Sequence, residues 1–236
     1  IIIGSVGAGM TAAAIVAGYG PPRVRRHGAA GWANFEAVRK AGHTGVRLNT
    51  GHTSYADPDD FKRSKQMNVG ADSLVSLAYP MPSTMAVCSE AQMNRYTPVK
   101  SLVDAGVRVG LSADYPVTPC DPFVNMYIAM TRSYPGGEAL KDVEREAIDL
   151  KTAIQCYTAN SSYMVGMEDK VGTIEVGKKA DLIVLDRNPF EIPVKELPEV
   201  NVLATMMDGK VVHEEAIDWG APSGLPNWNA RDAWQQ

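Results

Sequence analysis

Ala105–Pro116 reads A-G-V-R-V-G-L-S-A-D-Y-P, and this stretch decides the fold that we expect. Gly106 is typical of a helix end, and the alternating apolar residues of Val107–Leu111 predict a short buried strand. Asp114 follows this strand in a loop that a proline closes. In α/β folds such a position is open to ligand while the strand fixes its backbone, so Asp114 is a candidate functional residue. The alternative is that Asp114 only caps a turn.

The other segments alternate between predicted strands and predicted helices. Asp57 before Pro58 is typical of a helix N-cap, which makes the helix that starts there the clearest of them. Strands that alternate with helices predict a parallel sheet or barrel with right-handed crossovers. Strands are predicted near Ile1–Ile3, Gly45–Thr50 and Val69–Ala78, and helices over Ala33–Lys40, over Pro58–Gln66, from Thr97, after Asp121, over Ile148–Tyr157 and over Ser161–Val165.

The character of the sequence changes at Val171, where short β-rich runs separated by glycine turns begin. The turn at Asp208 and Gly209 joins two of these runs and predicts a β-hairpin. We therefore divide the chain into a barrel part over 1–170, a small β unit over 171–217 and an irregular tail over 218–236. The β-rich runs are Leu182–Leu185, Val202–Met207 and Lys210–Val212.

Composition and charge exclude several classes of partner. The 236 residues carry a formal net charge of −4, so we expect no attraction to nucleic acid or to an anionic membrane surface. A run of about 18 apolar residues that could span a membrane does not occur. Three widely spaced cysteines predict neither a disulfide framework nor a CxxC metal site, which favours a cytoplasmic location. The chain starts at Ile1 without a signal-peptide pattern, so we expect its true beginning to be missing or processed.

One motif near the start indicates a different function. Gly7-x-Gly9-x-x-Ala12 follows a predicted strand and precedes a predicted helix, as in dinucleotide-binding folds. The acidic residue expected about 20 residues further on is absent, because Gly18–Gly31 contains prolines, arginines and glycines instead. Packing of a strand against a small-residue helix is therefore the favoured interpretation. Dinucleotide binding stays the weaker alternative.

Several longer stretches resemble the amidohydrolase superfamily, and in particular its amidohydrolase family 3 branch. Val171–Asp186, V-G-T-I-E-V-G-K-K-A-D-L-I-V-L-D, and Met206–Val212, M-M-D-G-K-V-V, resemble the closing strands, which belong to a small β-sandwich built from both chain ends. Arg95–Val117 resembles the eighth barrel strand with its lead-in helix, and Ala153–Gly166 extends the match. The resemblance implies an α/β fold: a partial (β/α)8 TIM-type barrel of the later strands with a small C-terminal β-sandwich portion, as the C-terminal half of such an enzyme.

The resemblance also implies roles for two residues. Asp114 matches the eighth-strand aspartate, which binds the metal and takes a proton from the attacking water. Gly51–Phe61, G-H-T-S-Y-A-D-P-D-D-F, resembles the segment with the fifth-strand histidine, so His52 matches a metal ligand. Zn²⁺ is the implied cation, since it binds imidazole and carboxylate. A loop histidine bonded only to backbone is the alternative for His52.

The sequence departs from the family pattern at other ligand positions. No His-x-His pair exists among His27, His43, His52 and His213, and Met81-Pro82 stands where the sixth-strand histidine is expected. Two protein ligands are fewer than the three of a catalytic zinc site. The resemblance therefore implies a hydrolase of C–N bonds in small amides or cyclic amides, impaired unless a homo-oligomer or a missing N-terminal half adds ligands. A non-catalytic α/β binding or structural module is the alternative.

Overall fold

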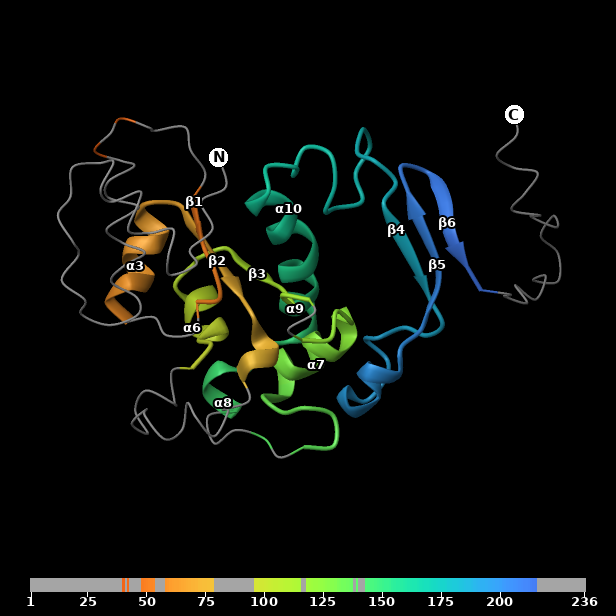
Figure 1. Cartoon of the computed structure of the whole chain (residues 1–236), viewed down its shortest axis with the longest axis horizontal. Helices are drawn as coiled ribbons and strands as arrows, with labels where there is room; N and C mark the ends of the chain where they lie inside the picture. The colour runs from red at the N-terminus through yellow and green to blue at the C-terminus, as the bar shows by residue number, and fades with distance from the viewer. Residues whose placement is uncertain are drawn as a thin grey trace.

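The computed structural model describes residues 40, 42, 48–53, 58–78, 96–115, 118–137, 139 and 143–215. The predicted strand at Ile1–Ile3, the glycine motif Gly7–Ala12 and the tail over 218–236 lie outside these residues. Nearly all of the predicted Ala33–Lys40 helix lies outside them as well. The described part contains a parallel sheet with helices against it, followed by an antiparallel sheet (Figure 1).

A three-stranded parallel sheet organises the first part of the described chain. Its strands, in spatial order, are β1 (Leu48–Thr50), β2 (Val69–Ser73) and β3 (Val109–Leu111). The helix α3 (Pro58–Gln66) connects β1 to β2, and α6 (Val99–Asp104) precedes β3. Parallel neighbours need such crossover connections, because a tight hairpin joins only antiparallel strands. The predicted α/β arrangement with a parallel sheet is confirmed for these strands.

One face of this sheet packs against helices and forms the main core. Asp121 caps α7 (Pro122–Thr131) as predicted, because its carboxylate accepts from the backbone N–H groups of Phe123 at 2.8 Å and Val124 at 3.3 Å. Side chains of the sheet are buried there against those of α6, α7 and α9, among them Ala71, Val109, Leu111, Val99, Leu102, Met126, Ile128, Leu150 and Ala153. The helices that follow β3 are α7 (Pro122–Thr131), α8 (Val143–Glu146) and α9 (Leu150–Gln155).

The opposite face of the sheet has glycines where α10 (Ser161–Met164) packs. A Cβ atom on Gly110 would lie 2.8 Å from Met164 Sδ, and one on Gly70 would lie 3.2 Å from Met164 Cγ. Asn49 Nδ2 also donates to the main-chain oxygen of Met164 at 2.9 Å. The glycines therefore allow α10 to approach the sheet at a distance that a side chain would prevent.

Substitution of Gly110 by alanine is expected to lower the free energy of unfolding by about 1–3 kcal/mol, because the new methyl group overpacks against Met164. The matched test is the same substitution in a Met164→Ala background, where the space around the new methyl group is larger. Urea unfolding of the four proteins should show a smaller loss in that background. An equal loss in both backgrounds would mean that the contact with Met164 is not the cause.

Two elements differ from their predicted bounds. β2 ends at Ser73, and Val75–Ala78 forms the 3-10 helix η1 in place of the end of the predicted strand. The first two residues of η1 are buried, and an apolar run alone does not distinguish a buried strand from a buried helical turn. The predicted Ile148–Tyr157 helix begins two residues later, at Leu150, and after α9 the chain continues as the π-helix η2 (Cys156–Asn160).

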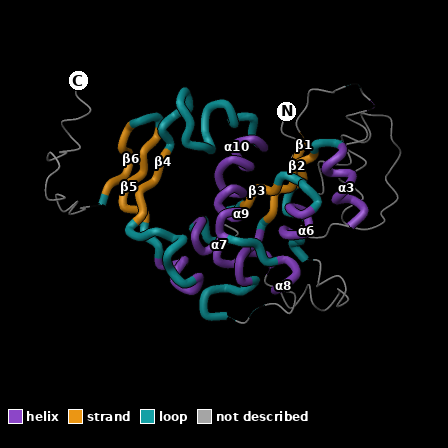
Figure 2. The backbone as a smooth tube through the Cα atoms, turned by 180° about the vertical axis from the view of Figure 1, so that it is seen from behind, coloured by secondary structure: helices purple, strands orange, loops and turns teal. Residues whose placement is uncertain are grey.

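An antiparallel sheet follows α10 along the chain and is seen from behind in Figure 2. Its hairpin of β5 (Val202–Met207) and β6 (Lys210–Glu214) turns at Asp208 and Gly209, which confirms the predicted hairpin. The 3-10 helix η3 (Val194–Glu199) reaches the main core, where Leu197 and Val200 are buried. The described residues show one sheet in this unit, so the β-sandwich portion and the domain limits stay predictions. The strands are β4 (Leu182–Leu185), β5 (Val202–Met207) and β6 (Lys210–Glu214).

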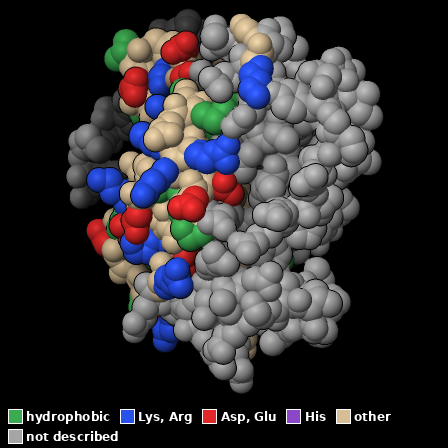
Figure 3. Space-filling model, turned by 90° about the vertical axis from the view of Figure 1, so that its left-hand side faces the viewer, with side chains coloured by type: hydrophobic (Ala, Val, Ile, Leu, Met, Phe, Trp, Pro, Cys, Tyr) green, Lys and Arg blue, Asp and Glu red, His purple; other side chains and the backbone are tan. Residues whose placement is uncertain are grey.

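The described surface has no strong field of one sign on the side shown in Figure 3. Basic and acidic side chains lie interspersed over the described part of that face. This mixture agrees with the small net charge of the whole sequence. Within the described segments, none of the helices is long and apolar enough to cross a membrane.

Candidate functional site

His52 and Asp114 lie together at the carboxyl ends of two parallel strands. His52 comes two residues after β1, and Asp114 comes three residues after β3. The His52 Nε2 atom lies 3.2 Å from Asp114 Oδ2, and about half of each side chain is exposed. Because β2 lies between the two strands, the loops bring the residues together over the end of β2. The predicted shared position at this end of the sheet is confirmed.

Both residues have left-handed backbone conformations. The φ angle is 59° at His52, 31° at Thr53 and 49° at Asp114. Such angles are uncommon outside glycine, cost about 1–3 kcal/mol each, and cluster at functional sites. The Thr53 hydroxyl donates to the Asp72 carbonyl at 2.9 Å and lies 2.7 Å from the Thr50 hydroxyl. The fold therefore holds the His52 turn in a conformation that the local chain disfavours.

Sequence reasoning missed a third polar residue, Asp72, on the central strand β2. Burial raises the pKa of the Asp72 carboxyl, while a hydrogen bond from the Ser112 side chain lowers it. The charge and the backbone N–H of His52 also lower this pKa, and the negative charge of Asp114 raises it. Asp72 therefore lies close to both candidate residues. A charged residue inside a strand predicted to be buried was the signal that could have identified it.

The donor atoms of this pair fit a zinc ion in type, since imidazole nitrogen and carboxylate oxygen are zinc ligands. The 3.2 Å between His52 Nε2 and Asp114 Oδ2 is an ion-pair distance, so the two side chains contact each other directly. No group of three or more histidine, cysteine or acidic side chains suited to a metal occurs among the described residues. The described part thus offers two candidate ligands, whereas a catalytic zinc site has three protein ligands.

The other residues considered from the sequence lie away from this pair or outside the described segments. His213 is exposed on β6, opposite Thr205 in the antiparallel sheet. His27, His43 and the Met81-Pro82 pair are outside the described residues. Cys120 is exposed in the loop before α7. Among the described residues, His213 and Cys120 therefore add nothing to the candidate site.

A parallel sheet with crossover helices and with polar side chains at the carboxyl ends of its strands defines the class of α/β proteins that bind their ligands at this end of the sheet. Within that class, the chain belongs to the amidohydrolase family, whose family model matches residues 24–213. The matched range contains His52, Asp114 and all strands from β1 to β5. The resemblance inferred from the motifs is confirmed.

Two curated relatives and one solved structure show the extent of the similarity. The N-substituted formamide deformylase of Arthrobacter pascens is 32% identical over 182 residues, 76% of this chain and 33% of that protein. The imidazolonepropionase of Kosmotoga olearia is 26% identical over 126 residues, 52% of this chain and 28% of that protein. An uncharacterised metal-dependent hydrolase from Pyrococcus horikoshii has the same fold, with a TM-score of 0.60 and 23% identity over 70% of this chain and 33% of its own. The chain spans about a third of the length of the curated relatives it matches.

The neighbour order of the strands changes the barrel strand to which His52 is assigned. Barrel strands follow chain order around the barrel, and β1, β2 and β3 are consecutive hydrogen-bonded neighbours. With β3 as the eighth strand, as the resemblance implies, β2 is the seventh and β1 is the sixth. His52 then follows the sixth strand instead of the predicted fifth. With that numbering, His52 corresponds to the sixth-strand histidine that the sequence led us to expect at Met81-Pro82.

Proposed function

We propose that this chain forms the last part of the barrel of a metal-dependent hydrolase that acts on C–N bonds other than peptide bonds. The observation that carries the proposal is the His52–Asp114 pair, 3.2 Å apart at the carboxyl ends of parallel strands. Membership of the amidohydrolase family supports it. So do the names of the two curated relatives, a deformylase of N-substituted formamides and an imidazolonepropionase.

The two residues have different tasks in this proposal. His52 holds a divalent cation, which we propose to be zinc, through its Nε2 atom. When bound, the cation lowers the pKa of water and polarises a carbonyl group. Asp114 contributes a carboxylate oxygen to the same site and accepts a proton from water during attack on the amide. Both tasks use the side-chain atoms that face each other, Nε2 and Oδ2.

Further ligands have to come from polypeptide other than the described residues, since these supply two. We propose either another part of the same protein or a second copy of the chain as their source. In this proposal residues 1–170 belong to the barrel, 171–217 to a composite β-sandwich and 218–236 to an irregular tail. The substrate is a small amide or cyclic amide, and the location is the cytoplasm, with no role for nucleic acid or membrane. On its own, the chain is impaired as a catalyst.

Metal binding tests the proposed site directly. The purified chain is expected to bind Zn²⁺ weakly, and His52→Ala should weaken binding by more than about 100-fold, because loss of a direct ligand exceeds the roughly 10–100-fold loss typical of an orienting partner. Equilibrium dialysis with elemental analysis measures the bound metal. His213→Ala is the matched control and should leave zinc binding unchanged, since His213 is exposed on β6. Zinc binding that His52→Ala does not affect, or no zinc binding, would favour a non-catalytic α/β module.

A further inference from the structure

We propose that Asp72 is a positioning residue, which ties the loop after β1 to the loop after β3 and thereby fixes His52 relative to Asp114. The effect of this positioning on hydrolysis rests on the proposed function. Its effect on the position of His52 is independent of that function, because it follows from contacts within the described residues.

The position of Asp72 in the sheet suits this task. Asp72 lies on the central strand and pairs in register with Gly110 on β3. Alternation along β2 places its side chain on the same face as Gly70. Because neither glycine has a side chain, the carboxylate of Asp72 meets no neighbouring side chain from these two positions. It can therefore reach both loops that leave the carboxyl end of the sheet.

Two groups, one from each loop, donate to the Asp72 carboxylate. The backbone N–H of His52 donates from the β1 side, and the hydroxyl of Ser112 donates from the β3 side. Ser112 is itself fixed to β2, because its backbone N–H donates to the Ser73 carbonyl at 3.1 Å. Ser112 precedes Asp114 by two residues. A single carboxylate thus connects the backbone of one candidate ligand to the chain next to the other.

The main chain of Asp72 contributes to the same connection. Its carbonyl accepts from the Thr53 hydroxyl at 2.9 Å, so both the side chain and the backbone of Asp72 hold the turn at His52 and Thr53. That turn has φ angles of 59° and 31°, which a short loop does not keep without bonds that fix it. Hydrogen bonds in which a carboxylate accepts are stronger than those between neutral groups. The carboxylate of Asp72 is therefore suited to hold the strained turn.

Hydrogen exchange at the His52 amide tests the connection without any metal or substrate. In the full chain, NMR-detected exchange of this amide should be at least about 10-fold faster in Asp72→Ala than in the unchanged protein, because its acceptor is lost. Asp72→Asn should restore part of the protection, since its carbonyl oxygen still accepts one hydrogen bond. Amides in the core, such as that of Leu102, should exchange as before. Asp104→Ala is the control, because Asp104 is exposed on α6.

Unchanged exchange at His52 in Asp72→Ala would overturn the proposal, and so would a uniform acceleration that includes Leu102, since that indicates loss of the fold. Zinc affinity provides a second measurement. If the proposed metal site exists, Asp72→Ala should weaken zinc binding by about 10–100-fold, as expected for a residue that orients a ligand. Faster exchange at His52 in a chain that binds no zinc supports the positioning role and contradicts only the proposed function.

Discussion

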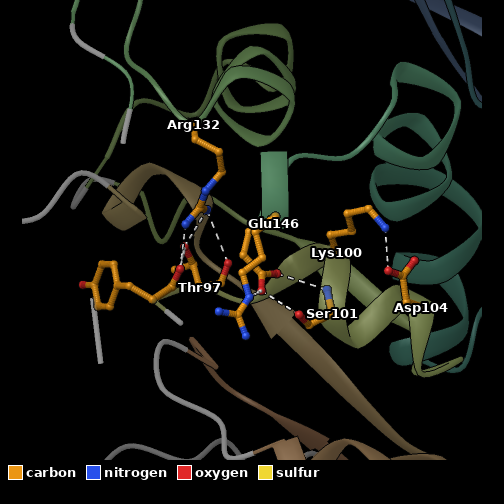
Figure 4. A network of polar contacts seen from close by, with 8 residues as sticks. Thr97, Lys100, Ser101, Asp104, Arg132 and Glu146 are labelled. Carbon is orange, nitrogen blue, oxygen red and sulfur yellow. Dashed lines mark hydrogen bonds and ion pairs between the residues drawn. The ribbon is translucent and has the colours of Figure 1, made fainter. Parts of the chain in front are cut away.

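Replacement of Arg132 by methionine is expected to lower the free energy of unfolding by about 2–5 kcal/mol, because it leaves buried acceptors without their donor. Arg132 is 2% exposed and ends α7 with a left-handed φ of 54°. Its guanidinium donates to the Tyr96 carbonyl at 2.7 Å and to the Thr97 hydroxyl at 2.9 Å (Figure 4). These acceptors lie just before α6, so the interaction joins the end of one helix to the start of another. A loss of this size is a large part of the roughly 5–15 kcal/mol that stabilises a typical domain.

Urea unfolding measures this effect, and two further substitutions identify its cause. Arg63→Met removes an exposed arginine from α3 and should change stability by no more than about 0.5 kcal/mol. Arg132→Lys keeps the charge but loses the planar guanidinium that donates to several acceptors at once, so an intermediate loss of stability is expected. A loss for Arg132→Met no larger than that for Arg63→Met would show that the buried hydrogen bonds contribute little.

The buried carboxylate of Glu146 also stabilises the start of α6 through hydrogen bonds. Glu146 on α8 is 1% exposed, and its carboxylate accepts from the backbone N–H of Ser101 at 3.0 Å and from its hydroxyl at 2.6 Å (Figure 4). Ser101 lies in the first turn of α6, where backbone N–H groups have no partner within the helix. Glu146 and Arg132 thus both stabilise the start of α6, the helix that leads into β3 and Asp114.

The sequence predicts the elements that local rules determine. Apolar alternation identifies the strand that ends near Leu111, Asp121 followed by proline identifies the start of α7, and the Asp-Gly turn identifies the last hairpin. Each of these signals depends on residues that are close together along the chain. The positions of His52 and Asp114 also follow from such local signals, since a residue just after a predicted parallel strand must lie at the carboxyl end of the sheet.

The features that the sequence does not predict depend on residues far apart in the chain. Asp72 bonds to groups on the neighbouring strands, and its role depends on a left-handed turn at His52 that no local motif indicates. Arg132 and Glu146 are of types that are mostly exposed, so their burial follows only from the packing of α6, α7 and α8. The assignment of His52 to the sixth strand likewise needs the neighbour order of the sheet.

Asp114→Asn is expected to reduce any zinc-dependent amide hydrolysis by at least about 100-fold, because a general base contributes about 10²–10⁴-fold and asparagine cannot accept the proton. The assay measures release of formate from N-formyl amines and opening of cyclic amides, with and without added Zn²⁺. Asparagine has nearly the same shape as aspartate, so the substitution tests the charge and basicity of residue 114 and leaves its volume unchanged. Zinc-dependent turnover that Asp114→Asn leaves unchanged would contradict the role of Asp114.

Turnover by the chain alone should be slow even before this substitution. In the proposed site, His52 and Asp114 supply one nitrogen and one carboxylate, whereas a catalytic zinc has three protein ligands and an open position. A cation held by two protein ligands exchanges more readily and orients its bound water less well. Both the metal occupancy and the rate of hydrolysis should therefore be low. If polypeptide that carries further ligands is added and the rate rises, Asp114→Asn should abolish that increase as well. Fast zinc-dependent hydrolysis by the chain alone, abolished by Asp114→Asn, would instead show that the additional ligand lies within this sequence, outside the described residues.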